Sequence, residues 1–377
     1  MACDSLYVAW LKAHYPYELY ATMLDIFDKK KNKDKIANII SEMKRYKGID
    51  ITPGCFGQDN RDWLIDKGNK LISQSLSSIR YMQKTTAEEL FELSRQDTAC
   101  MGTYFTKDVF TPEIKPVITK LKRQLKPLQK QGEEMFNSGV DIFSEEFLAV
   151  YDKGYALEQE IKRLEADNNS YMERAREVKV TAKLDCFTNV LRAIHIGTGV
   201  KQNQIEILIG LNYFSRFGKT GKLMKVYREY FEGPNNLKNK SLASFQERLE
   251  TLRKFEASLP DTDLPSGLRL KTEYDNIGLC LSTDPSAPNH AYFVQSVDDK
   301  YGVKAKLYNI RRGTTGIIRI ARQNYLPIAE GSCINIENYR VSPKYAFRNG
   351  QKTVIPGEKE IWVTEYSVMQ KGEAGVS

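Results

Sequence analysis

The chain has 377 residues, more than one ordinary domain needs, so two or three domains are expected. Hydrophobic residues make up 41% and charged residues 28% of it, a composition typical of globular proteins. No apolar run approaches the roughly 18 to 20 residues that a membrane-spanning helix needs, and the first residues lack the pattern of a signal peptide. These features argue against a membrane protein, and we expect a cytoplasmic location.

The cysteines, the histidines and the net charge narrow the class further. The six cysteines are scattered without a CxxC pair, so neither a zinc ribbon nor a disulfide framework is predicted. The three histidines match no metal-ligand pattern, and no metal site is expected. The net charge of +8 favours a polyanionic partner. Residues 291–369 hold twelve Lys/Arg against seven Asp/Glu, so a nucleic-acid-binding site is expected in this C-terminal part before any other.

The first half of the chain is predicted to be mostly helical. Residues 6–46 have helical apolar spacing, interrupted at Pro16. A Pro/Gly-rich turn at 53–57 ends this pattern, and two short helices are expected within residues 69–95, around LISQSLSSI and TTAEELFELS. Compact helices return between residues 184 and 258.

Residues 112–180 predict a long helical hairpin. Apolar residues recur at helical spacing over 114–128, and a heptad-like seam runs over 157–178. The first arm is basic, whereas residues 133–177 hold twelve acidic and five basic residues, so the arms are expected to attract each other. A protruding arm that touches DNA or a protein and a solvated two-helix insertion are both open, and charged helix faces favour the second.

From about residue 291 the apolar period changes from 3.6 to 2, which predicts strands. The expected strands are AYFVQSV, VKAKLYNI, TGIIRIA, SCINIENYRV and KEIWVTEYSV, with a long basic loop at 342–358 before the last one. Five short strands with one long basic connection are typical of a small oligonucleotide-binding (OB) barrel, and another five-stranded barrel or sandwich stays open.

Several segments follow the sequence patterns of one known family. DSLYVAWLKAHYPYELYATML follows the pattern A-Y-L-K-A-H-Y-P closely from Trp10 to Pro16. GIDITPGCFGQDNRDW is similar to a P-P-D-I-N turn, and SLSSIRYMQKTTAEELFEL to the helix-hairpin-helix pattern I-K-G-V-G. TEYDNIGLCLSTDP is similar to a joint that reads E-x-E-x-L-G-L-x-L-S-x-H-P. Together these segments resemble the C-terminal part of bacterial and phage DNA polymerase III alpha subunits.

The resemblance and the predicted elements together imply a multidomain α+β chain. It would contain an N-terminal all-α, helix-hairpin-helix-like region, a long helical hairpin insertion that has no counterpart in the family, and a C-terminal five-stranded OB-like β-barrel. The expected parts are 1–50 as the end of the fingers, 51–97 with 184–258 as the helix-hairpin-helix-like region, 98–183 as the insertion, 259–290 as the joint and 291–370 as the OB-like domain.

In that family the helix-hairpin-helix grips one DNA strand through backbone N–H groups of a Gly-x-Gly hairpin, where a phosphate can approach closely. This chain departs from the pattern, because it has Met82-Gln83-Lys84 there. The candidate DNA contacts are then Lys84, Thr85 and Thr86 at the start of the next helix. A DNA contact and a purely structural hairpin are both open.

For the OB-like domain the resemblance implies a basic groove with aromatic side chains, on which each stacked base contributes roughly 1 to 3 kcal/mol. The candidates are Arg311, Arg312, Arg319, Arg322, Tyr325, Lys344, Tyr345, Phe347, Arg348 and Lys352. Tyr345, Phe347 and Arg348 are favoured because they lie in the expected long loop. Trp362, which alternates with Val363, is expected in the core.

Nucleotide addition in that family depends on palm-domain carboxylates that hold two Mg²⁺ ions. No pair of acids here matches them, so we expect no catalytic residue and no resident cofactor, and the chain alone should not polymerise. The expected partners are duplex and single-stranded DNA, the palm-containing part of the polymerase, and a sliding clamp bound through residues 246–252. The alternative is a structural or interaction protein that assembles through the helical hairpin.

Overall fold

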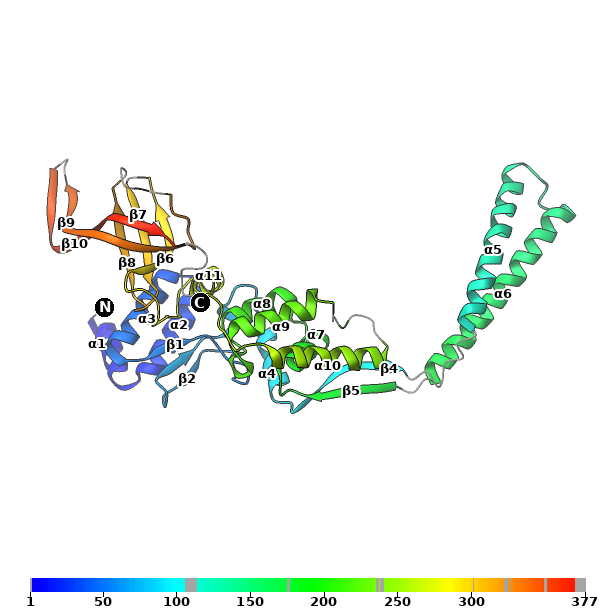
Figure 1. The fold of residues 1–377 in the computed structure, drawn as a ribbon, viewed down its shortest axis with the longest axis horizontal. Helices are drawn as coiled ribbons and strands as arrows, with labels where there is room; N and C mark the ends of the chain where they lie inside the picture. Colours follow the sequence, from blue (N-terminus) through cyan, green and yellow to red (C-terminus); the bar gives the residue numbers. More distant parts are fainter. Residues whose placement is uncertain are drawn as a thin grey trace. The chain divides into compact units, whose positions relative to one another are not determined.

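The computed structural model describes residues 2–105, 114–174, 177–234, 237, 241–300, 302–321, 325, 327–348 and 351–369. The expected mixed α+β class is confirmed, because these residues contain eleven α-helices and a five-stranded sheet (Figure 1). The chain divides into two compact units. The first comprises Met1–Ala99, Ala182–Asn239 and Phe245–Ser377, and the second Cys100–Thr181 with Lys240–Ser244. None of the helices in the described ranges is long and apolar enough to cross a membrane.

The chain begins with three helices, α1 (Ala2–His14), α2 (Pro16–Lys29) and α3 (Lys33–Lys47). Pro16 occupies the first position of α2, where its missing N–H is not needed. The Asn32 side chain accepts a hydrogen bond from the backbone N–H of Lys35 and caps α3, and Gly48 ends that helix in the left-handed conformation. The apolar faces of α2 and α3 form one core with Ile72.

A small sheet follows these helices, in the order β1-β3-β2. Its strands are β1 (Asp50–Thr52), β2 (Leu64–Asp66) and β3 (Leu71–Ser73). The expected helix around LISQSLSSI is therefore wrong over its first residues. Pairing with both neighbours buries Ile72 as a strand residue, and only a single 3-10 turn, η1 (Leu76–Ser78), follows.

The compact helices expected within residues 69–95 and 184–258 are present, except over LISQSLSSI, and a further helix, α11 (Ser266–Ile277), lies in the segment 259–290 that was expected to be a joint. The expected helices are α4 (Lys84–Ser94), α7 (Phe187–Gly197), α8 (Gln202–Gly210), α9 (Thr220–Glu232) and α10 (Leu242–Ser258), with the 3-10 turn η3 (Ser215–Phe217). Phe187 and Phe214 are fully buried with their ring centroids 5.2 Å apart. This aromatic contact joins α7 to the segment after α8.

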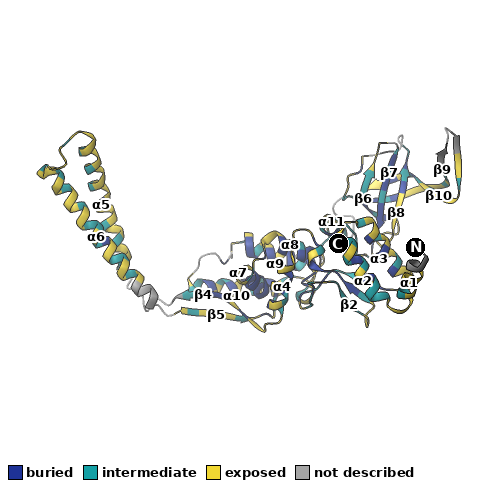
Figure 2. Ribbon diagram, turned by 180° about the vertical axis from the view of Figure 1, so that it is seen from behind, coloured by how far each residue is buried: buried dark blue, intermediate teal, exposed yellow. Residues whose placement is uncertain are grey.

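The second unit contains the predicted helical hairpin, α5 (Ile114–Asn137) and α6 (Glu145–Arg174). Leu125 and Ile161 are its buried seam residues, and Figure 2 shows that most of the remaining hairpin surface is exposed or intermediate. Lys122 Nζ lies 2.6 Å from Glu165 Oε1, as expected from the opposite charges of the arms. The predicted helical seam is wrong near its end, because β5 (Glu177–Lys183) pairs with β4 (Thr98–Phe105) in a ribbon that the sequence did not predict.

The five C-terminal strands form a closed barrel in the order β10-β8-β7-β6-β9. They are β6 (Ala291–Asp298), β7 (Val303–Asn309), β8 (Thr315–Ile320), β9 (Cys333–Arg348) and β10 (Gln351–Val368). All pairs are antiparallel except β8 with β10. Alternate residues such as Leu307, Ile318 and Val363 fill the interior, as the period of 2 requires.

One outer side of the barrel is covered by α11 and the joint before β6. Phe293 and Tyr308 are buried there against Leu270 of α11. The carboxylate of Glu273, itself buried, accepts hydrogen bonds from the backbone N–H groups of Leu281 and Ser282. A buried carboxylate with several donors fixes the joint in one conformation.

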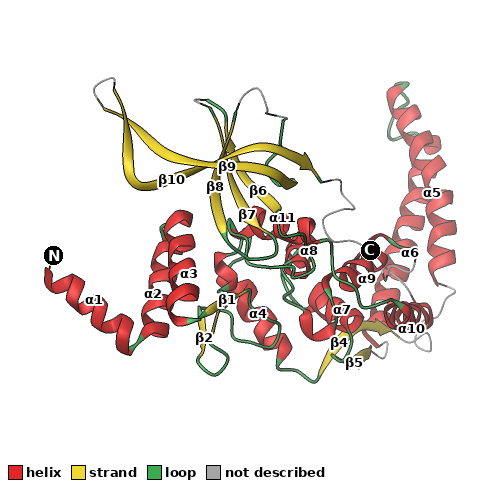
Figure 3. Ribbon diagram, turned by 60° about the vertical axis from the view of Figure 1, so that its left-hand side comes forward, coloured by secondary structure: helices red, strands yellow, loops and turns green. Residues whose placement is uncertain are grey.

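The expected long loop at 342–358 is wrong. Both strands continue through it as a paired extension, which we call the arm and define as residues 341–348 of β9 and 351–361 of β10 (Figure 3). Pro356 and Gly357, which indicated a loop, lie in a bulge where the register shifts between Val354 and Lys359. A bulge accommodates a proline and a left-handed glycine without ending the pairing.

Candidate nucleic-acid interface

The start of α4 carries Lys84, Thr85 and Thr86, the three residues predicted to contact DNA in the helix-hairpin-helix-like region. Lys84 is exposed, and its ammonium lies 3.7 Å from the Asp62 carboxylate. Thr85 is exposed as well, but Thr86 is buried, so its hydroxyl is not offered to a ligand. The helix begins after Gln83, whose side chain makes no capping hydrogen bond. Backbone N–H groups of the first turn therefore remain for an outside acceptor.

The turn before α4 contains a feature that the sequence analysis missed. Tyr81 has a φ of 65°, a left-handed conformation that glycine adopts most easily. Met82, next to it, is buried, so the turn keeps its apolar anchor. Gln204 of α8 donates to the Tyr81 carbonyl at 2.7 Å and holds the turn in place. The turn before α4 therefore adopts a left-handed conformation without a glycine.

Arg311 and Arg312 lie in the turn between β7 and β8. Arg311 donates to the Ala287 carbonyl at 3.4 Å, whereas among the described residues the guanidinium of Arg312 has no hydrogen bond or ion pair. The buried Asn309 fixes the turn, because its side chain accepts from the backbone N–H of Arg312 and donates to the Asn289 carbonyl. A turn held by Asn309 therefore presents Arg312, whose guanidinium has no ion pair within the described part of the chain.

A basic and aromatic row crosses four strands on the outer face of the barrel. Lys304 of β7 pairs with Arg319 of β8, Arg319 with Trp362 of β10, and Trp362 with Arg340 of β9. The guanidinium carbons of the two arginines lie 5.6 and 5.8 Å from the Trp362 ring centroid, within cation–π range. Arg319 also forms an ion pair with Glu360 at 2.8 Å.

The prediction that Trp362 lies in the core is wrong. Val363 takes the interior position and is fully buried, so the alternation of the strand places Trp362 outside. The alternation was recognised from sequence, but which of the two residues points inward depends on the pairing of β10 with β8.

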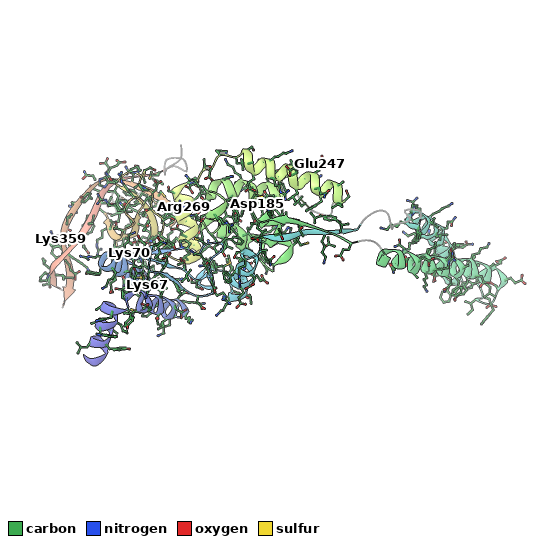
Figure 4. The ribbon with its side chains drawn as sticks, turned by 90° about the horizontal axis from the view of Figure 1, so that it is seen from below. Lys67, Lys70, Asp185, Glu247, Arg269 and Lys359 are labelled. Carbon is green, nitrogen blue, oxygen red and sulfur yellow. The ribbon has the colours of Figure 1, made fainter. Side chains whose placement is uncertain are left out.

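The arm presents one largely apolar face. Tyr345, Val341 and Pro343 alternate along β9, and their partners on β10 are Val354, Ile361 and Lys359 (the last labelled in Figure 4). Tyr345 is 39% and Val354 48% exposed. The favoured Tyr345 therefore lies on a strand rather than in a loop, on a face whose described side chains include the cation Lys359.

The other face of the arm carries Lys344, whose ammonium lies 2.6 Å from Glu358. That charge is compensated within the arm, so Lys344 is a weaker candidate than Lys359. Arg322 and the side chains of Phe347, Arg348 and Lys352 lie outside the described residues.

Two aromatic residues near the barrel serve packing. Tyr325 is half-buried against the barrel core. Tyr308 is buried, burial raises the pKa of its phenol, and its hydroxyl donates to the Ser282 carbonyl at 2.9 Å. Neither ring lies open for stacking on a base.

The segment that resembles a clamp-binding peptide lies within α10. Its two hydrophobic residues, Leu249 and Leu252, are buried in the helical core, whereas Gln246 and Glu247 are exposed. Clamp binding through this segment would require the helix to leave its place.

Comparison with known proteins adds no relative. No family model matches the chain, and no curated protein matches it. The likeness to polymerase III alpha subunits therefore depends on the sequence segments quoted above.

Proposed function

We propose that this chain is the DNA-binding C-terminal portion of a DNA polymerase III alpha-like protein and holds template and primer during replication. The observation that carries the proposal is the barrel topology. Numbered from β6, the strands pair in the order 1-2-3-5-4-1, with the third and fifth strands parallel. We assign this five-stranded barrel to the OB fold, which binds oligonucleotides.

Single-stranded template would follow the arm and the barrel. Bases would stack on Tyr345 and on the apolar face around it, each contributing roughly 1 to 3 kcal/mol. Phosphates would be neutralised by Lys359, Arg312 and Arg340, with release of counterions. Exposed rings beside cations that form no ion pair among the described residues support single-strand binding.

Duplex would be held by the helical region. The first turn of α4 offers Lys84 and its free backbone N–H groups, and helix N-termini bind phosphate oxygens well. The left-handed Tyr81 places the chain as a Gly-containing hairpin would. These contacts to phosphate groups would position the duplex on the protein and would not distinguish one base sequence from another.

Fluorescence anisotropy across a salt series tests the proposal, with single-stranded, duplex and primer-template DNA as ligands. We expect Tyr345→Ala to weaken single-strand binding about 10-fold, the effect of losing one stacked base of about 1.4 kcal/mol. Lys84→Gln should instead weaken duplex binding. Tyr46→Ala, which removes an exposed tyrosine on α3, is the matched control. No binding of any DNA by the wild type at low salt would sink the proposal.

A second candidate function is assembly through the helical hairpin. Tyr151 and Tyr155 of α6 are exposed with their rings stacked at 6.2 Å, and Leu148 and Phe143 are exposed nearby in the chain. Apolar side chains gathered on a solvated helix are typical of protein-binding surfaces.

A further inference from the structure

A hollow of about 310 Å³ opens at the end of the barrel where β8 begins. The buried side chains of Leu307, Ile318 and Ile336 contribute its apolar lining. Tyr339 and Ile361 line it as well and stay 53% and 41% exposed. Exposed apolar surface of this kind is typical of a site that a ligand or partner covers.

The rim of the hollow is polar and rigid. Arg312 and His290 lie on it, from the β7–β8 turn and from the segment before β6. The buried Asn309 ties these two segments together through Arg312 N–H at 2.7 Å and the Asn289 carbonyl at 3.0 Å. The backbone that carries Arg312 is thereby held at the edge of an apolar space, and its exposed guanidinium forms no ion pair within the described ranges.

A glycine keeps the hollow open. Gly316 of β8 lines it, and a Cβ built on Gly316 would meet no atom within 4 Å. Gly316 pairs with Leu307 and has the same parity as the inward-facing Ile318, so a side chain there would point into the hollow. Its backbone needs no left-handed conformation, so the absence of a side chain has no local structural reason.

The hollow also continues the apolar face of the arm. Val341 pairs with Ile361, and Tyr339 pairs with Val363, so the arm face that carries Tyr345 continues past the bulge and the Pro343–Lys359 pair to Tyr339 and Ile361. A strand of nucleic acid on the arm would therefore arrive at the mouth of the hollow.

We propose that this hollow receives one base of a nucleotide, beside Tyr339, with the phosphate at Arg312. This inference rests on the proposed function and names a ligand site within it. An apolar hollow of this volume lies at the lower end of small-molecule sites, which span roughly 300 to 1,000 Å³, and takes a single ring system. The shared chemistry is an aromatic base with a phosphate, either within a single strand or in a free nucleotide.

The test fills the hollow and measures binding by anisotropy. Gly316→Val places a β-branched side chain in it without backbone strain and suits a strand. The ligands are a labelled 12-mer of thymidylate, an abasic sugar-phosphate 12-mer and thymidine 5′-monophosphate. Gly132→Val, at a glycine of α5 that is also without neighbours, is the matched control. Thermal unfolding checks that both variants fold.

We expect Gly316→Val to bind the thymidylate 12-mer about 10-fold more weakly than the wild type and the abasic 12-mer equally well. Arg312→Gln should weaken both 12-mers and lower the salt dependence by about one phosphate contact. If the wild type binds the 12-mer more tightly than the monophosphate, the site belongs to the single strand; the reverse order makes it a free-nucleotide site.

The failures are separable. A folded Gly316→Val that binds the thymidylate 12-mer and the monophosphate as the wild type does overturns the base site and leaves the proposed function standing. A wild type that binds the monophosphate but no DNA overturns the proposed function and leaves the base site. Binding of neither ligand overturns both.

Discussion

Glu42 joins the first helix to the third. Its carboxylate accepts hydrogen bonds from the Lys12 ammonium at 2.6 Å and from the Tyr20 hydroxyl at 2.9 Å. These two donors, Lys12 above all, hold the pKa of Glu42 below its usual range. Burial and the same carboxylate raise the pKa of Tyr20 to about 12. An ionised Glu42 therefore contributes to the docking of α1 through its ion pair with Lys12.

The pH dependence of stability follows from this lowered pKa. A group whose folded pKa lies below its unfolded pKa stabilises the fold at neutral pH, and that contribution is lost as the pH falls through the folded pKa. We expect Glu42→Gln to lower the free energy of unfolding at pH 7 by about 0.5 kcal/mol, since the pair is a third exposed, and to change it little in acid.

Urea unfolding followed by tryptophan fluorescence measures this difference, because Trp63 packs against the same core. Glu146→Gln, at an exposed site of α6, is the control and should shift neither value. A gap between Glu42→Gln and the wild type that grows as the pH falls would contradict the assignment.

At the scale of elements, α10 closes the start of α7. The N-cap of α7, Cys186, makes no side-chain hydrogen bond. Glu256 of α10, itself buried, accepts instead from the backbone N–H groups of Phe187 and Thr188, each at 2.8 Å, and from the Thr188 hydroxyl at 2.6 Å. The cap is thus supplied by a residue about 70 positions away in the chain.

Removal of this cap should be costly. Glu256→Ala leaves two buried N–H groups and a hydroxyl without their acceptor, and we expect a loss of about 2 to 4 kcal/mol in the free energy of unfolding. Glu247→Ala, at an exposed position of the same helix (labelled in Figure 4), should change it by less than about 0.5 kcal/mol. Thermal and urea unfolding measure both variants, and equal stability of the two would refute the role of Glu256.

Local patterns sufficed for elements whose partners lie close in the chain. The apolar stripe of α5 and the seam of α6 predicted the hairpin, and alternation predicted all five barrel strands. Pairing between strands that lie far apart in the chain could not be predicted from local patterns. The β4–β5 ribbon joins segments about 80 residues apart, and Pro356-Gly357 indicated a loop because a bulge within a pair cannot be recognised from one strand alone.

The candidate site was predictable to the same extent. Basic and aromatic residues were expected in the C-terminal part of the chain, but Tyr345, Phe347 and Arg348 were expected in a loop and lie on β9, and the grouping of such residues depends on register. The parallel pairing of β8 with β10 brings Arg319 beside Trp362, and no spacing in the sequence encodes that contact. The hollow was missed for a similar reason, since Gly316 and Tyr339 approach only when the barrel closes.

At the scale of the whole molecule, the distribution of charge separates the two candidate functions. α5 has six Lys/Arg against two Glu, and α6 has eight Asp/Glu against four Lys/Arg, so the hairpin is dipolar with little net charge. Lys122 and Lys130 already pair with glutamates. The C-terminal strands, in contrast, keep a net positive charge. The binding of nucleic acid should therefore depend on the barrel far more than on the helical hairpin α5–α6.

Excision of the hairpin tests this division. We expect a variant in which residues 106–176 are replaced by a short Asn-Gly turn to fold, because β4 and β5, which flank this segment in the chain, pair with each other and such a turn suits a two-stranded connection. It should bind single-stranded DNA within about 2-fold of the wild type and with the same salt slope, since the slope counts the phosphates that are neutralised. The full-length variant with Lys120, Arg123 and Lys126 changed to Gln is the control, and should behave likewise.

A drop of more than about 10-fold in the DNA affinity of both variants would make α5 a DNA-binding element. Unchanged DNA binding together with loss of self-association in sedimentation would instead make the hairpin the assembly element, and the two functions would then belong to different units of one chain.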